Sequence, residues 1–151
     1  MTAMPRRTNK GAILTELIRS VFPLNGRLLE AGDRISSKVG LSSALWQVLG
    51  AINDNPRTVP QIGRIMGLAR QSVQRSVNIL ESDGLVELVA NPDHKTSPIV
   101  QLTAKGENAF SEVMKIQIDW SNNLATTFRT KDLQVAVAVL ESFKEALENG
   151  E

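Results

Sequence analysis

The chain has 151 residues, of which 42% are hydrophobic and 22% charged, a composition typical of a folded protein of one domain. It contains no cysteine, which excludes disulfides, thiol catalysis and zinc–thiolate sites, and its formal net charge is only +1. No apolar run of signal-peptide length follows the basic N-terminal residues, and no stretch reaches the ~20 apolar residues of a membrane span, so we expect a cytoplasmic protein without a membrane partner.

Helical periodicity dominates the chain and predicts a mainly α fold. A long first helix is expected over residues 9–38, where Pro23 interrupts the pattern by removing a backbone donor. Ser42 is a suitable N-cap for a second helix over residues 43–53.

Two short helices are predicted next. Thr58 and Gln61 have the spacing of a capping box, so a helix begins after Thr58, and Gly67 ends it. Another helix follows at once over residues 70–82 and ends before Gly84, which stands in the C-terminal glycine position.

The pattern then changes to that of strands. Residues 85–89 alternate in polarity, residues 99–102 form a second apolar run, and the polar residues 91–98 between them are rich in turn formers. The sequence therefore predicts a short hairpin with an exposed tip.

Two long helices complete the predicted fold. Thr103 caps a helix that runs to about residue 127. Thr130, with Asp132 in the first turn, is expected to cap a last helix that runs through Leu147.

A short helix, a glycine-containing turn, a second helix and a hairpin follow one another in the order of a winged helix-turn-helix. In the second helix, Val73, Val77 and Leu80 are spaced to face a core. The polar side chains left on its other faces are Arg70, Gln71, Gln74, Arg75 and Asn78. Arginine pairs bidentately with guanine, and Gln or Asn with adenine, so this helix suits the DNA major groove.

The charge distribution points to the same helix. Between residues 55 and 80 every charged side chain is an arginine, namely Arg57, Arg64, Arg70 or Arg75. A local all-basic segment in a nearly neutral chain indicates a surface that meets nucleic acid. The alternative interpretation is a solvated face that is rich in Arg and Gln for solubility.

Several of these stretches closely resemble the MarR family of bacterial transcription regulators. They read Leu-Ser-Ser-Ala-Leu-Trp-Gln-Val-Leu at residues 41–49, Ile-Gly-Arg-Ile-Met-Gly-Leu-Ala-Arg-Gln-Ser-Val-Gln-Arg at 62–75 and Leu-Glu-Ser-Asp-Gly-Leu-Val at 80–86. The match continues through Asn-Pro-Asp-His-Lys at 91–95 and Leu-Thr-Ala-Lys-Gly at 102–106. Outside residues 41–106 it rests on the length and order of the helices.

The resemblance implies a homodimer whose terminal helices interlock and whose two winged lobes read an inverted repeat in double-stranded DNA. It also implies a repressor that a small aromatic or anionic effector releases. The residues that we expect to contact DNA are Arg57, Thr58, Arg70, Gln71, Ser72, Gln74, Arg75, His94, Lys95 and Thr96.

Three departures from the family pattern stand out. The family's wing commonly carries Asp-x-Arg, but His94 and Thr96 occupy the matching positions, which leaves Lys95 as the nearest substitute for the missing arginine. Ala69 stands where Ser or Thr would cap the recognition helix. The thiol of the oxidant-sensing branch is absent because the chain has no cysteine.

The expected architecture is one mainly α domain over residues 1–151. It comprises a winged lobe over residues 41–103 with a small β-hairpin wing, flanked by dimerisation helices over residues 9–38 and 104–148. The apolar stripes of the terminal helices exceed what one small lobe covers, which predicts the homodimer. These stripes contain Ile13, Leu17, Val21, Leu133, Val137, Leu140 and Leu147.

Other functions have weaker support in the sequence. Trp46 and Trp120 fit either a ligand pocket or the core. The sole histidine, His94, lies in a polar loop, so we expect neither a metal, nor another cofactor, nor an enzyme. The alternative from another class is a winged-helix module that binds a protein instead of DNA.

Overall fold

The computed structural model describes residues 4–150, and within them the chain forms six α-helices, one 3₁₀ helix and three short strands. It divides into two compact units, one that ends at Val113 and one that begins at Met114. The mainly α winged helix-turn-helix fold is confirmed. The single domain predicted over residues 1–151 includes residues 1–3 and 151, which lie outside the described residues, and it stays a prediction.

The first helix, α1, spans Asn9–Ser36 and begins where the Thr8 hydroxyl accepts a hydrogen bond from the amide of Gly11, at 3.0 Å. Pro23 lies inside α1, which continues through it and passes into a 3₁₀ helix over Ser37–Val39. The predicted helix over residues 9–38 is therefore confirmed, and Pro23 does not end it.

Local capping signals set the next two helices. Helix α2 spans Ser43–Ile52 and is capped by Ser42, as predicted. Helix α3 spans Val59–Met66, and the capping box between Thr58 and Gln61 is complete in both directions.

The turn between α3 and the next helix depends on two glycines. Gly67 ends α3 at a φ of +65°, a left-handed conformation that glycine adopts without strain. A Cβ atom at Gly63 would lie 2.8 Å from the carbonyl oxygen of Leu68, so the helix and the turn approach closely at this point. Helix α4 then spans Arg70–Ser82, as predicted.

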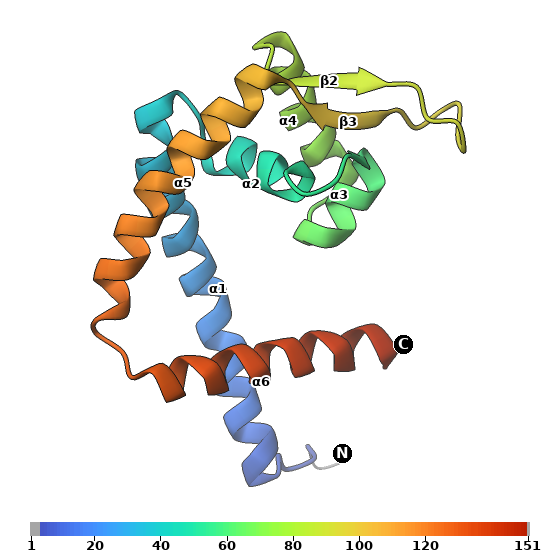
Figure 1. Ribbon diagram of the computed structural model, residues 1–151. Coiled ribbons are helices and arrows are strands. Elements are labelled where there is room, and N and C mark those ends of the chain that lie inside the picture. The colour runs from blue at the N-terminus through green and yellow to red at the C-terminus, as the bar shows by residue number, and fades with distance from the viewer. Residues whose placement is uncertain (1–3, 151) are drawn as a thin grey trace. The chain divides into compact units, whose positions relative to one another are not determined.

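The sheet has one strand more than the sequence indicated. Strands β2 (Val86–Val89) and β3 (Ile99–Leu102) form the predicted antiparallel hairpin, whose loop projects from the lobe in Figure 1. A two-residue strand β1, Arg57–Thr58, pairs with the other edge of β3, with Arg57 opposite Val100. Two residues are too few to produce an alternating pattern, which is why β1 was not predicted.

The core of the first unit lies among α2, α3, α4, the sheet and residues 104–113, which follow the sheet. Its side chains are apolar, and burying each of them stabilises the fold by roughly 1.5–3 kcal/mol. The large side chains that are fully buried here are Val48, Leu49, Ile62, Val73, Val77, Leu80, Val100 and Val113.

Helix α5 spans Ala104–Ala125, and the part up to Val113 belongs to the first unit. Thr103 caps it, as predicted, by accepting the amide of Gly106 at 3.1 Å. A side chain at Gly106 would overlap the carbonyl oxygen of Leu85, so α5 crosses the chain after α4 at a point where only glycine fits.

Helix α6 spans Thr130–Asn149 in the second unit and contains no buried residue. The prediction that Thr130 caps α6 is wrong, because Thr130 is already helical and the N-cap position belongs to Arg129. Arg129 provides no side-chain cap but forms an ion pair with Asp132 at 2.8 Å. None of the described helices has both the length and the apolar character that crossing a membrane requires.

Candidate nucleic-acid interface

Helix α4 has one buried face and one polar face. Val73, Val77 and Leu80 are fully buried, which anchors the helix on the core of the lobe and confirms the predicted inward face. The predicted outward residues are all exposed, and they are Arg70, Gln71, Gln74, Arg75 and Asn78. Ser72, which was expected among the DNA contacts, is also exposed.

Most of the polar groups on this face are not used within the chain. Gln74 donates a hydrogen bond to Asn78 at 2.9 Å, one turn further along α4. Over residues 4–150, the guanidinium groups of Arg70 and Arg75 have neither a hydrogen bond nor an ion pair. At the start of α4, Ala69 has an extended backbone and gives no side-chain cap, as its sequence position indicated. The face therefore offers two guanidinium groups without partners in the described residues, together with several side-chain amide groups.

A recess of about 260 Å³ lies between the start of α3, the polar face of α4 and the wing. It brings the predicted contact residues Arg70, Gln71 and Gln74 of α4 together with Thr96 of the wing. Ser72 and Arg75 do not line this recess, although both are exposed on α4.

A second recess of about 420 Å³ lies between α3 and the wing loop. His94 and Thr58 line it, together with Arg64, which the all-basic segment predicted on the surface that meets nucleic acid, and Gln61, which was not predicted as a DNA contact. The place of Gln61 in this recess depends on where the wing lies relative to α3, which no local sequence pattern indicates. Lys95 is exposed on the wing loop and lines neither recess.

The wing loop is held at its ends by one side chain. The amide of Asn91 donates to the carbonyl oxygen of Ser97 at 3.1 Å, and its carbonyl oxygen accepts from the backbone of Asp93 at 3.0 Å. Between these points, His94, Lys95 and Thr96 are exposed. Within the described residues, no group of three or more potential ligands is placed to hold a metal ion.

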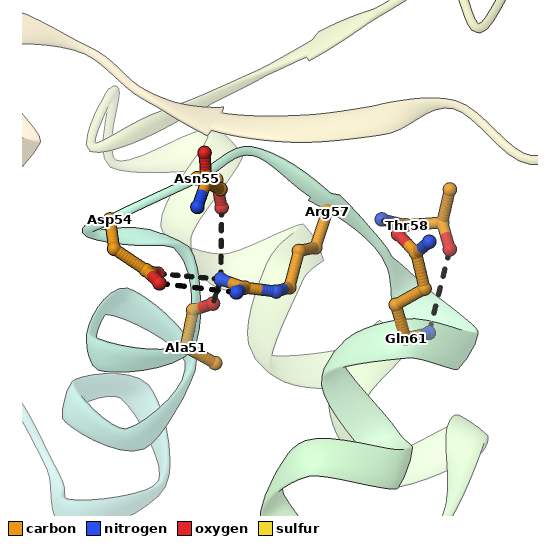
Figure 2. A network of polar contacts seen from close by, with 6 residues as sticks. All are labelled: Ala51, Asp54, Asn55, Arg57, Thr58 and Gln61. Carbon is orange, nitrogen blue, oxygen red and sulfur yellow. Dashed lines mark hydrogen bonds and ion pairs between the residues drawn. The ribbon is translucent and has the colours of Figure 1, made fainter.

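Arg57 differs from the arginines of α4 because its side chain is engaged within the chain (Figure 2). Its guanidinium donates to both carboxylate oxygens of Asp54, at 2.6 and 3.2 Å, and to the carbonyl oxygens of Ala51 and Asn55. The hydrogen bond from Arg57 holds the pKa of the Asp54 carboxyl well below its ordinary value, and Asp54 in turn raises the pKa of Arg57. Whether Arg57 contacts DNA stays a prediction.

Thr58 and the two tryptophans also occupy defined positions. The side chain of Thr58 is used in the capping box of α3, and the residue is 9% exposed. Trp46 is partly buried on α2 in the first unit, whereas Trp120 is partly buried on the part of α5 that belongs to the second unit. A ligand pocket at Trp46 and Trp120 stays a prediction.

Comparison with known proteins identifies the family. The MarR family model matches residues 39–95, which include helices α2, α3 and α4 and the first strand of the wing. The Mycobacterium tuberculosis protein Rv2011c is 38% identical over 121 residues, a match that covers 80% of this chain and 85% of that protein. The chain belongs to the MarR family of transcription regulators. It is therefore a regulator and not an enzyme.

Solved structures of other transcription regulators share the fold. The MarR/EmrR family transcriptional regulator from Acinetobacter sp. ADP1 superimposes with a TM-score of 0.80 at 18% identity, covering 90% of this chain and 97% of that one. The transcriptional repressor CouR, solved bound to a 23-mer DNA duplex, superimposes with a TM-score of 0.76 at 20% identity, covering 92% of this chain and 99% of that one. At these identities the likeness concerns the fold alone.

Proposed function

We propose that this MarR-family chain binds an inverted-repeat operator in double-stranded DNA as a homodimer and represses transcription until a small ligand releases it. The observation that carries the proposal is the polar face of α4, on which the guanidinium groups of Arg70 and Arg75 are exposed and free of partners over residues 4–150. The major groove is wide enough to admit such a helix.

In this proposal α4 reads bases and the wing holds the backbone. The guanidinium groups of Arg70 and Arg75 can pair with guanine and the amides of Gln71 and Gln74 with adenine, while the hydroxyl of Ser72 can pair with either kind of base. His94, Lys95 and Thr96 lie on the exposed wing loop and meet phosphates or the adjacent minor groove.

The homodimer is supported by apolar side chains that the single chain leaves exposed. On α6 the exposed fraction reaches 61% at Val137 and 62% at Leu147, and on α1 it is 60% at Ile13 and 73% at Phe22. Exposed apolar side chains that gather on one helix mark an interaction surface more often than isolated ones do. A second copy of the chain offers the same apolar helices and would cover them.

Release by a ligand requires that the ligand bind one state of the dimer more tightly than another. A small aromatic or anionic effector at Trp46 or Trp120 would act by favouring a spacing of the two lobes that does not match the operator. The proposal can therefore fail at this step while DNA binding stands.

The test is selection from genomic DNA by the purified full-length chain, followed by sequencing and by titration of the selected duplex. We expect an inverted repeat with half-sites about 10 base pairs apart, or a multiple of this, since the dimer places two recognition helices about one helical turn apart. Light scattering should give two chains, free and on one duplex.

Two results would contradict the proposal in different ways. A stable monomer at micromolar concentration would overturn the homodimer. Affinity for DNA that stays flat between low and physiological salt would overturn DNA as the partner, since each neutralised phosphate contributes about 0.9 to the logarithmic salt slope. A homodimer without salt-sensitive DNA binding would favour a protein-binding module.

A further inference from the structure

We infer that Arg57, together with Asp54, is a positioning residue: it fixes the loop between α2 and β1, and through β1 it fixes the start of α3 and the base of the wing. The inference rests on the proposed DNA-binding function and assigns Arg57 a role different from the direct DNA contact that the sequence suggested. It follows from three features of the structure.

The first feature is the set of groups that the guanidinium binds. Ala51 belongs to the last turn of α2, where carbonyl oxygens lack partners within the helix, and Arg57 donates to the oxygen of Ala51. The same guanidinium donates hydrogen bonds to both carboxylate oxygens of Asp54 and to the carbonyl oxygen of Asn55, the last at 3.1 Å (Figure 2). One side chain therefore ties the end of α2 to the loop that leaves it.

The second feature is the place of Arg57 in the backbone. Arg57 lies opposite Val100 and Thr58 opposite Ile99, so β1 is paired with the central strand of the sheet. Thr58 is also the N-cap of α3. A shift of Arg57 would therefore move both the strand that carries the wing and the first turn of α3.

The third feature is competition for the guanidinium. The side chain of Arg57 is 22% exposed, and its forked donors already face the Asp54 carboxylate. A DNA phosphate would have to displace this carboxylate to bind the edge of the guanidinium that carries Nη1 and Nη2, and without displacing it could reach only the edge that carries Nε. Arg64, on α3, is exposed and has no hydrogen bond or ion pair within residues 4–150. It therefore serves as the control arginine for Arg57, with the same charge but no partner.

The decisive variant is Asp54→Ala. A positioning role for Arg57 and a phosphate contact by Arg57 predict changes of opposite sign in the affinity for DNA. If Arg57 positions the loop, Asp54→Ala weakens binding to operator and scrambled duplexes alike, by about three- to tenfold, and leaves the salt slope unchanged. If Arg57 is a phosphate contact, Asp54→Ala removes a negative charge, frees a positive one, tightens binding and steepens the slope.

Substitutions at Arg57 give a second readout. Lysine keeps the positive charge but lacks the forked donors of a guanidinium, so under the positioning role Arg57→Lys weakens DNA binding as much as Arg57→Gln does. The double variant Asp54→Ala/Arg57→Gln should bind DNA no more weakly than either single variant, because both substitutions break the same contact. Recovery of wild-type affinity in Arg57→Lys overturns the inference. Arg64→Gln is the control and should reduce the salt slope, provided that urea unfolding shows each variant folded.

Amide hydrogen exchange separates this inference from the proposed function. If the wild-type chain binds no DNA, the proposed function fails, but exchange still tests the positioning role. We expect faster exchange at Thr58 and Val100 in Asp54→Ala and no change there in Arg64→Gln. Unchanged exchange in Asp54→Ala overturns the positioning role, whether or not the chain binds DNA.

Discussion

Helix α4 and the wing border the same recess, but they are held in different ways. Helix α4 is fixed by three fully buried side chains, Val73, Val77 and Leu80, that lie directly under its polar face. The loop of the wing is tied by hydrogen bonds of Asn91 at its ends, and its tip residues are exposed. A side chain that reads a base edge must extend from a backbone that packing holds in place, whereas a side chain that contacts a phosphate can extend from a mobile loop. The difference supports the proposal that α4 reads bases and that the wing holds the backbone.

The largest effect is expected on the buried face of α4. Leu80→Ala removes a fully buried side chain and should lower the free energy of unfolding by roughly 2–5 kcal/mol, measured by urea denaturation. The matched control is Asn78→Ala on the exposed face, which should change it by about 1 kcal/mol or less. Equal effects of the two variants would mean that α4 is not anchored as described.

The next effect is on operator preference. Arg75→Ala or Gln71→Ala should reduce the preference for operator over scrambled DNA by roughly 1–3 kcal/mol, or about 5- to 150-fold, because the variant cannot form a bidentate hydrogen bond to a base. Fluorescence anisotropy titrations of both duplexes measure this ratio. Arg34→Ala, an exposed arginine near the end of α1, serves as the control and should leave it unchanged.

A smaller and different effect is expected at the tip of the wing. Lys95→Ala should weaken binding to operator and scrambled duplexes about equally, and the salt slope should fall by about one for each phosphate that the lysine no longer neutralises. Selective loss of operator preference in this variant would reverse the assignment and make the wing the reading element, although it has Thr96 in place of the family's arginine.

The smallest effect should come from the base of the wing loop. Asn91→Ala removes two hydrogen bonds that close the loop and should lower the free energy of unfolding by about 0.5–1.5 kcal/mol. Affinity for both duplexes should fall slightly while the preference between them stays constant. A change in preference would indicate that the shape of the loop takes part in reading.

Features encoded by neighbouring residues could be predicted from the sequence. The capping box of Thr58 and Gln61, the N-cap at Ser42 and the left-handed end of α3 at Gly67 all depend on residues within one turn of each other. The inward and outward faces of α4 follow in the same way from helical periodicity.

Features that depend on packing between distant segments were not predictable. Strand β1 exists because β3, more than forty residues further along the chain, offers it a free edge. The partners of Arg57 lie within six residues of it, but no sequence pattern indicates that the turn after α2 brings them to its guanidinium. Arg64 joins the wing in one recess only once α3 and the hairpin are assembled. At Thr130 the local signal was misleading, since a residue type suited to capping lies one position inside α6.

The central claim is that the exposed face of α4 reads base edges, and a double-mutant cycle between protein and DNA tests it most directly. Each guanine of the selected operator is replaced in turn by 7-deazaguanine, which lacks the N7 acceptor that a bidentate arginine uses. Affinities are then measured for the wild-type chain, Arg70→Ala, Arg75→Ala and Lys95→Ala. We predict that at one guanine in each half-site the replacement weakens wild-type binding but not binding by one of the two α4 variants, while Lys95→Ala remains as sensitive as the wild type. Equal sensitivity of both α4 variants and the wild type at every guanine would contradict the claim.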